Sequence, residues 1–168
     1  MARAFGVKSS APTITTIDHL QGIDEARPGN YIFFDAFQAR LGSCALADCA
    51  LTVLASVVHR DAGRQQLIID AGAIALSKDR GPFEFDPKCG YGKVLDLEGN
   101  DLHLVVDEMS QEHGVMLASV NSAFDRLKVG SRVRILANHS CLTAAQHTHY
   151  NVLEGDRVVD QWQINTGW

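Results

Sequence analysis

A histidine and a cysteine near the end of the chain have the residue types and the spacing of a metal-binding pair. His139 and Cys141 directly follow the largely apolar stretch 133–137. In an extended strand alternate side chains point the same way, so the imidazole and the thiolate could both reach one metal ion. Two protein ligands leave positions open on the ion, which indicates a catalytic metal or further ligands from elsewhere. The alternative is a loop histidine beside a buried free cysteine.

A second candidate pair places a carboxylate next to an imidazole. Glu112 and His113 could act together, with His113 as a general base or as a group that orients a metal-bound partner. The alternative is a polar turn between two strands. His147 and His149 could fold back to the same site as Cys141, or they could lie on the surface as ordinary histidines.

Two segments with small residues could bring backbone or a hydroxyl group close to such a site. Within residues 70–79, Gly72 permits close backbone approach and Asp79 can accept hydrogen bonds from backbone N–H groups. A tightly packed corner of the fold would explain the same residues. Tyr91 stands between two glycines and could direct its hydroxyl into a cleft, or its ring could pack against the core.

Composition indicates one globular domain whose partners are small molecules or proteins. The 168 residues are 46% hydrophobic and 21% charged, which suffices for a real core. A net charge of -5 argues against a nucleic-acid partner. The longest apolar run is far shorter than a bilayer span, and no apolar segment follows the basic first residues, so we expect a cytoplasmic protein with no membrane partner.

The chain lacks the common nucleotide-binding, hydrolase and metalloprotease motifs, so smaller patterns carry the argument. Four cysteines without a signal peptide predict free thiols rather than a disulfide framework. These cysteines are Cys44, Cys49, Cys89 and Cys141.

The predicted fold is mainly β. Short runs rich in β-branched and aromatic residues alternate with turn residues, and one short helix is expected over residues 36–46. About eight or nine short strands indicate a closed or nearly closed β-barrel. The nine candidate strands are residues 31–35, 51–59, 66–70, 93–97, 102–109, 115–120, 132–138, 150–153 and 157–164. The strand over 51–58 is expected to be buried on both faces, and Gly155 is expected to form a hairpin turn.

Seven short segments in register resemble one family, the C-terminal domain of D-threonine aldolases and D-serine dehydratases. The resemblance covers about residues 25–168. The segments are residues 27–35 (RPGNYIFFD), 49–57 (CALTVLASV), 70–72 (DAG), 75–79 (ALSKD), 90–92 (GYG), 112–114 (EHG) and 138–141 (NHSC).

The family is similar to fold-type III pyridoxal-phosphate enzymes such as alanine racemase, in which a β domain completes a site on a cofactor barrel. By that resemblance, His139 and Cys141 match the pair that binds zinc beside the cofactor in the dehydratase branch. Zinc suits a thiolate better than magnesium or manganese does. The resemblance implies residues 1–26 as a stub resembling the end of the cofactor barrel, and residues 27–168 as the β-barrel domain.

No lysine of this chain matches the family's Schiff-base position, so pyridoxal phosphate is expected only in a complete enzyme. The lysines are Lys8, Lys78, Lys88, Lys93 and Lys128. The resemblance implies the metal-binding domain of a lyase that dehydrates D-serine or cleaves D-threonine, active only with a cofactor-bearing barrel, which another chain could supply. The alternative is a non-catalytic binding or scaffold module, a relic or one half of a split enzyme.

Self-association is also expected, since the surface that would meet the cofactor barrel is left uncovered. Three apolar residues of the stub are candidates for the contact of a homodimer or larger assembly. They are Phe5, Ile14 and Ile17.

Overall fold

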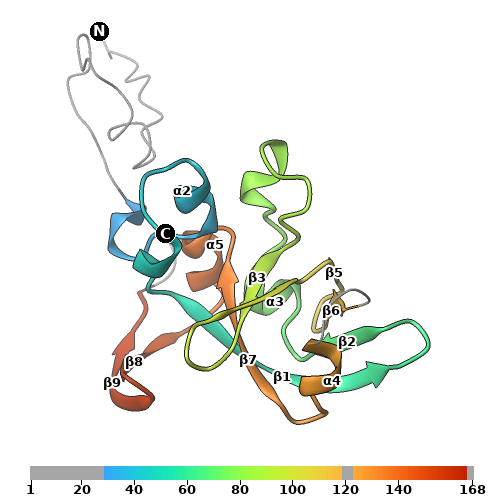
Figure 1. The fold of residues 1–168 in the computed structure, drawn as a ribbon. Coiled ribbons are helices and arrows are strands. Elements are labelled where there is room, and N and C mark those ends of the chain that lie inside the picture. The colour runs from blue at the N-terminus through green and yellow to red at the C-terminus, as the bar shows by residue number, and fades with distance from the viewer. Residues whose placement is uncertain (1–28, 119–122, 166–168) are drawn as a thin grey trace, which may run out of the picture.

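The computed structural model describes residues 29–118 and 123–165 and is mainly β (Figure 1). The strands are β1 (Thr52–Asp61), β2 (Gln66–Ile69), β3 (Gly92–Leu95), β4 (Asp101–Val105), β5 (Glu108–Met109), β6 (Gly114–Leu117), β7 (Arg132–Ala137), β8 (His149–Glu154) and β9 (Arg157–Gln163). The helices are η1 (Asn30–Ile32), α2 (Ala36–Arg40), η2 (Leu46–Asp48), α3 (Ala73–Leu76), η3 (Gly81–Glu84), α4 (Ala123–Arg126) and α5 (Ser140–Ala144), where η marks a 3-10 helix.

Seven strands form one antiparallel sheet that curls until its edges approach each other. The order is β4-β3-β7-β1-β2-β6-β5, so β4 and β5 are the edge strands. Two residues between them join the edges: Val106 N–H donates to Gly92 of β3, and Asp107 N–H donates to Val115 of β6. The prediction of a mainly β, nearly closed barrel is therefore confirmed.

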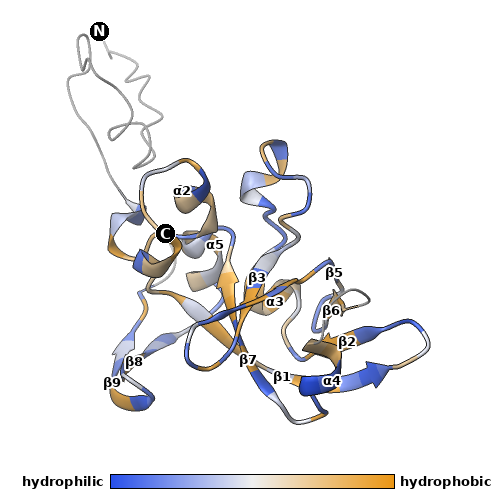
Figure 2. Ribbon diagram, in the orientation of Figure 1, coloured by the Kyte–Doolittle hydropathy of each residue, from blue (hydrophilic) through white to orange (hydrophobic). Residues whose placement is uncertain are grey.

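Alternating burial places the core on the inner face of this sheet. In β2 the side chains of Leu67 and Ile69 are fully buried, and in β7 those of Val133 and Ile135 are. Figure 2 shows apolar residues along β7 where it crosses the centre of the molecule. Successive side chains of a strand point to opposite faces of the sheet, and only one face of this sheet packs against the core. Buried and exposed residues therefore alternate, which explains why the sequence pattern located these strands.

The strand β1 is buried on one face only, which corrects the expectation of two buried faces. Ala55 and Val57 are buried, but Leu54 is 57% exposed and Val58 is 41% exposed on the other side. Apolar residues on both sides of a strand indicate burial only where a second layer covers the outer face. In the described part of the chain, no such layer covers these two side chains.

The hairpin β8–β9 forms a separate two-stranded sheet. Gly155 joins the strands with φ of +63°, so the predicted turn is confirmed. Every described side chain of β9 is exposed.

Three local predictions differ from the structure. Residues 31–35 form no strand, because Asn30 and Asp35 are buried in a polar network and the chain turns through η1 between them. Strand 102–109 is divided into β4 and β5. The predicted helix over 36–46 ends at Arg40, and α3, α4 and α5 were missed because helices of four or five residues are too short to show a helical period.

The stub 1–26, with Phe5, Ile14 and Ile17, lies outside the described residues, and the domain boundary drawn at residue 27 stays a prediction. Among the helices of the described residues, none combines the length and the apolar character needed to span a bilayer.

Candidate metal centre

The predicted ligands His139 and Cys141 lie together at the start of a helix rather than in a strand. The strand β7 ends at Ala137, His139 is the extended residue that precedes α5, and Cys141 belongs to the first turn of that helix. The Cys141 side chain nevertheless lies near enough to the His139 ring to raise the pKa of the imidazole. Cys141 is exposed and His139 is half-buried, so both remain within reach of an ion arriving from solvent or from another chain.

A carboxylate from a distant loop holds the His139 ring. Asp79 Oδ2 lies 2.6 Å from His139 Nδ1, and Asp79 Oδ1 accepts from the Gly81 N–H at 2.6 Å. Because Nδ1 faces the carboxylate, the free ring nitrogen for a metal is Nε2. This carboxylate–imidazole arrangement is the one that orients histidine ligands in metal sites. The predicted hydrogen bond from a backbone N–H to Asp79 is confirmed, but the hydrogen bond between Asp79 and His139 was not predicted.

The charges of the pair fit a bound cation. The Cys141 side chain and the Asp79 carboxylate raise the pKa of His139 to about 9, although burial acts in the opposite direction. Burial pushes the pKa of Asp79 upward, but hydrogen bonds from His139 and Gly81 outweigh it and leave the pKa below its usual value. A metal ion would therefore displace a proton from the imidazole and keep the carboxylate ionised behind it.

A buried polar network holds the other side of the same turn. Asp35 is fully buried, and its Oδ2 accepts from the Ser140 N–H at 2.9 Å and from Asn30 Nδ2 at 2.5 Å. Ser140 Oγ also donates to Asn30 Oδ1. Thr143, buried in α5, donates to the Leu76 carbonyl of α3 at 2.8 Å. The helix that carries Cys141 is thus fixed from two directions.

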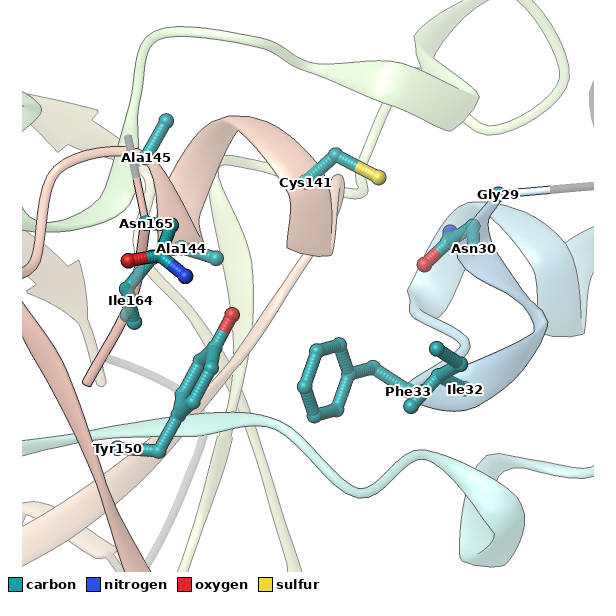
Figure 3. A pocket seen from close by; sticks show the side chains of 10 residues that line it. All are labelled: Gly29, Asn30, Ile32, Phe33, Cys141, Ala144, Ala145, Tyr150, Ile164 and Asn165. Atoms are coloured by element: carbon teal, nitrogen blue, oxygen red, sulfur yellow. The ribbon is translucent and has the colours of Figure 1, made fainter. Parts of the chain in front are cut away.

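A cavity of about 370 Å³ opens beside Cys141. Phe33 and Tyr150 pack with ring centroids 5.0 Å apart on one wall, and Figure 3 shows the Cys141 side chain extending from α5 toward Asn30. Burial raises the pKa of the Tyr150 hydroxyl, so this group stays protonated at neutral pH and can donate a hydrogen bond. The cavity can therefore admit a small polar ligand next to the thiol.

Glu112 and His113, the predicted catalytic pair, line a different cavity of about 380 Å³. His147 lines it too, and its Nε2 lies 3.0 Å from the Ala75 carbonyl. No residue lines both this cavity and the one beside Cys141. The structure therefore does not bring Glu112 and His113 into the metal pair, and their catalytic role stays a prediction.

The remaining candidates have structural partners. Gly72 packs so closely on the Glu112–His113 backbone that a Cβ there would lie 2.5 Å from the His113 nitrogen. Tyr91 packs against the hydrophobic core, and His149 Nδ1 lies 3.0 Å from its neighbour's hydroxyl, Thr148 Oγ1. All four cysteines are free thiols, which confirms the prediction.

Asp35 is the functional candidate that sequence reasoning missed. It stands in the segment 31–35, whose aromatic residues favoured a strand. A possible signal was the polar pair Asn30 and Asp35 flanking an otherwise apolar run. Within the described ranges, no group of three or more His, Cys, Asp and Glu side chains is arranged to hold a metal ion. Beyond this part of the chain, water, a substrate, another chain or residues outside the described ranges could supply further ligands.

Comparison with known proteins places this geometry in context. Residues 50–153 match the family described as a putative serine dehydratase domain. The chain is 39% identical over 164 residues to D-threo-3-hydroxyaspartate dehydratase of Delftia sp. (strain HT23), covering 95% of this chain and 43% of that protein. It is 37% identical to D-serine dehydratase of Dictyostelium discoideum, covering 88% and 38%. The chain thus spans about two fifths of the length of these dehydratases.

Solved structures agree with the sequence matches. The Delftia dehydratase superposes with a TM-score of 0.85 over 95% of this chain and 43% of its own. Structures of two variants of D-threo-3-hydroxyaspartate dehydratase also match: one has a histidine replaced by alanine, and the other, described as in the metal-free form, has a cysteine two positions further along replaced by alanine. An alanine racemase-like protein from Idiomarina loihiensis gives 0.84 at 36% identity, over 95% of this chain and 43% of that one.

One relative is of comparable length to the domain itself. An uncharacterized protein of Mycobacterium bovis is 31% identical over 133 residues, covering 77% of this chain and 92% of that protein.

Proposed function

Because the chain belongs to the putative serine dehydratase domain family, we propose that it supplies the metal-binding β domain of a lyase acting on D-β-hydroxy amino acids. The observation that carries the proposal is the His139–Cys141 pair held by Asp79. D-threo-3-hydroxyaspartate dehydratase was altered at a histidine and a cysteine with the same spacing, and the structure of the cysteine variant is of a metal-free form, which supports the assignment.

The donor set fits zinc. An imidazole nitrogen and a thiolate are zinc ligands, whereas magnesium and manganese take oxygen ligands. A zinc ion bound there would hold the β-hydroxyl of the substrate and ease its departure as hydroxide. The dehydratase names among the relatives favour this reaction over cleavage of the Cα–Cβ bond of D-threonine.

The chain's own residues have three tasks in this proposal. Asp79 fixes the ring of His139 so that Nε2 faces the ion. Cys141 supplies the second ligand at the edge of the cavity. The packed rings of Phe33 and Tyr150 form a wall that excludes water next to the reacting hydroxyl group. Glu112 and His113 remain candidates for proton transfer from their separate cavity.

Pyridoxal phosphate belongs, in this proposal, to a cofactor barrel in the complete enzyme, with the D-amino acid bound between the two domains. None of the described residues is assigned to that cofactor. The barrel could stand in the same polypeptide or in a partner chain. The family resemblance implies a homo-oligomer, and we propose that the enzyme is cytoplasmic.

Zinc titration tests the metal site directly. In isothermal calorimetry the parent chain should bind zinc weakly, because two protein ligands leave positions for water. His139→Ala and Cys141→Ser should abolish binding. His149→Ala and Cys44→Ser are matched controls that remove a histidine and a cysteine elsewhere and should bind as the parent does. If both site variants bind zinc like the parent, the assignment is wrong.

An activity assay tests the need for the barrel. The chain alone, incubated with pyridoxal phosphate, zinc and D-serine, should release no pyruvate or ammonia. Borohydride reduction should trap the cofactor on no unique lysine. Stoichiometric trapping at one of the five lysines would contradict the proposal that the cofactor belongs to the barrel.

The second candidate function is a stand-alone binding module. The relative from Mycobacterium bovis favours it, because this chain covers 92% of that protein. A neighbouring reading frame that encodes a cofactor barrel would favour the split enzyme instead.

A further inference from the structure

We propose that Asp35 is a positioning residue for metal binding by His139 and Cys141, acting through the Ser140 N–H. This inference rests on the proposed function above. It assigns a second carboxylate to the site, buried on the opposite side of the turn from Asp79.

The two oxygens of Asp35 serve two different parts of the chain. Oδ1 accepts from the Gln38 N–H at 2.9 Å and caps the helix α2. Oδ2 accepts from the Ser140 N–H at 2.9 Å and from Asn30 Nδ2 at 2.5 Å. Capping therefore accounts for one oxygen only, and the other is committed to the turn that carries the metal pair.

Ser140 is the residue between the two ligands. Its peptide N–H belongs to the rigid amide plane that joins it to His139, so a fixed N–H fixes the direction in which the following turn begins. Ser140 is 1% exposed, and its hydroxyl donates to Asn30, which shares the same carboxylate. Asp35 thus restrains the relative directions of the imidazole and the thiol.

The residue before the pair is held by the same helix. Phe37 N–H, in the first turn of α2, donates to the Asn138 carbonyl at 3.2 Å, and Asn138 Nδ2 donates to the Gly90 carbonyl at 2.9 Å. Figure 1 shows α2 and α5 next to each other at the end of the molecule where β7 finishes. The segment 138–140 is therefore fixed at each residue, and a carboxylate without exposed surface is at the centre of that arrangement.

Asp35→Asn tests the role of the second oxygen. An amide offers one acceptor oxygen and one N–H₂ group, so it cannot accept from both Gln38 and Ser140. Zinc affinity, measured by competition with a chromophoric chelator, should fall about 10- to 100-fold, as for other groups that orient metal ligands. Asp70→Asn is the matched control, since Asp70 accepts a single bond from the Ser56 N–H at 2.7 Å and should keep the parent affinity.

A second pair of variants leaves Asp35 intact. Ser140→Pro removes the N–H and the hydroxyl, whereas Ser140→Ala removes the hydroxyl alone. Proline is tolerated at the first position of a helix, and His139, with φ of -137° and ψ of 98°, has the extended conformation that proline requires of its predecessor. The proline variant should lose zinc affinity as Asp35→Asn does, and the alanine variant should lose much less.

Folding and metal geometry are measured on the same samples. Circular dichroism of the metal-free variants reports the fold, and the thiolate-to-cobalt absorption of the Co²⁺ form reports whether Cys141 still binds the ion. Loss of that absorption in a folded Asp35→Asn or Ser140→Pro protein supports the inference. If both variants keep the zinc affinity and the Co²⁺ absorption of the parent chain, the inference is wrong but the proposed function is unaffected. If the His139→Ala and Cys141→Ser variants bind zinc as the parent chain does, the inference and the proposed function are both wrong.

Discussion

Asp79 and His139 are 60 positions apart in the sequence, yet Oδ2 of the carboxylate lies 2.6 Å from Nδ1 of the imidazole. The loop after α3 therefore reaches the residue that precedes α5, and Thr143 ties the same two helices together through the Leu76 carbonyl. The Asp79 contact therefore fixes the orientation of the His139 ring within the candidate site.

Asp79→Asn should weaken zinc binding about 10-fold or more, because the amide no longer holds the imidazole with a charge. The pKa of His139 should fall toward its ordinary value, since the carboxylate is one of the groups that raise it. Nuclear magnetic resonance titration of the histidine ring and a zinc titration check the two effects. Asp101→Asn, which removes a carboxylate 3.5 Å from the exposed His103, should leave zinc binding unchanged.

Asp107→Asn should leave the protein at least as stable as the parent at neutral pH. Burial raises the pKa of Asp107, so the folded state holds its proton to higher pH than the unfolded state does. Stability is therefore lost as the pH rises through the folded-state pKa of Asp107. Above that pKa the ionised carboxylate destabilises the folded state. The amide oxygen can still accept from the Leu117 N–H, which donates to Asp107 at 2.7 Å.

Urea unfolding of Asp107→Asn at several pH values measures this effect, and the difference from the parent should vanish in acid. Asp96→Asn should behave in the opposite way. Hydrogen bonds from Asn100 lower the pKa of Asp96, so its stabilising contribution is present at neutral pH and is lost as the pH falls. Equal pH dependence in the two variants would contradict the prediction.

The four thiols should differ in their rates of alkylation by iodoacetamide at neutral pH. Burial, with a smaller contribution from Cys44, raises the pKa of Cys49 to about 12, so almost none of it is thiolate. Cys141 is exposed and should react first, and Cys49 should react last. Mass spectrometry of timed samples gives the order, and unfolding in urea should make the rates similar. Equal rates in the folded protein would show that Cys49 is not shielded.

Gly72→Ala should destabilise the protein by about 1–3 kcal/mol or more, the usual cost of forcing extra atoms into a packed region. The added Cβ would lie 2.5 Å from the His113 nitrogen and 2.6 Å from the Gln111 oxygen, both backbone atoms that cannot move aside alone. Gly63→Ala is the control, because its Cβ would meet only the Asp61 side chain at 3.4 Å. Urea unfolding compares the two, and equal effects would count against the close approach.

Most strands could be predicted because alternation of apolar residues is a local property. Inward residues such as Leu67 and Ile69 follow period two, and Gly155 marks a turn that needs positive φ. Residues 31–35 failed as a strand because long-range hydrogen bonds of Asn30 and Asp35 determine the backbone there. Phe34, with φ of +51°, adopts a conformation that its residue type does not favour.

Half of the candidate site could be read from the sequence and half could not. His139 and Cys141 are two positions apart, so residue type and spacing identified them. Their supports come from far away, since Asp35 lies 105 positions before Ser140 and Asp79 lies 60 before His139. Ser77, with φ of +70°, turns the chain just before Asp79, and nothing in the sequence predicted this turn. Such contacts depend on the packed fold.

The strand β7 is the last of the seven strands of the large sheet in the sequence, yet both of its edges are paired. The strand lies between β3 and β1, and its register pairs Leu136 with Thr52 and with Lys93. During synthesis β1, β2, β6 and β5 can pair with one another and β3 can pair with β4, but the ladder that joins β3 to β1 needs residues 132–137. Such non-local pairing slows folding to milliseconds or longer. His139 and Cys141 lie just after β7, so synthesis delivers the candidate metal pair only after all seven strands of the large sheet have been made.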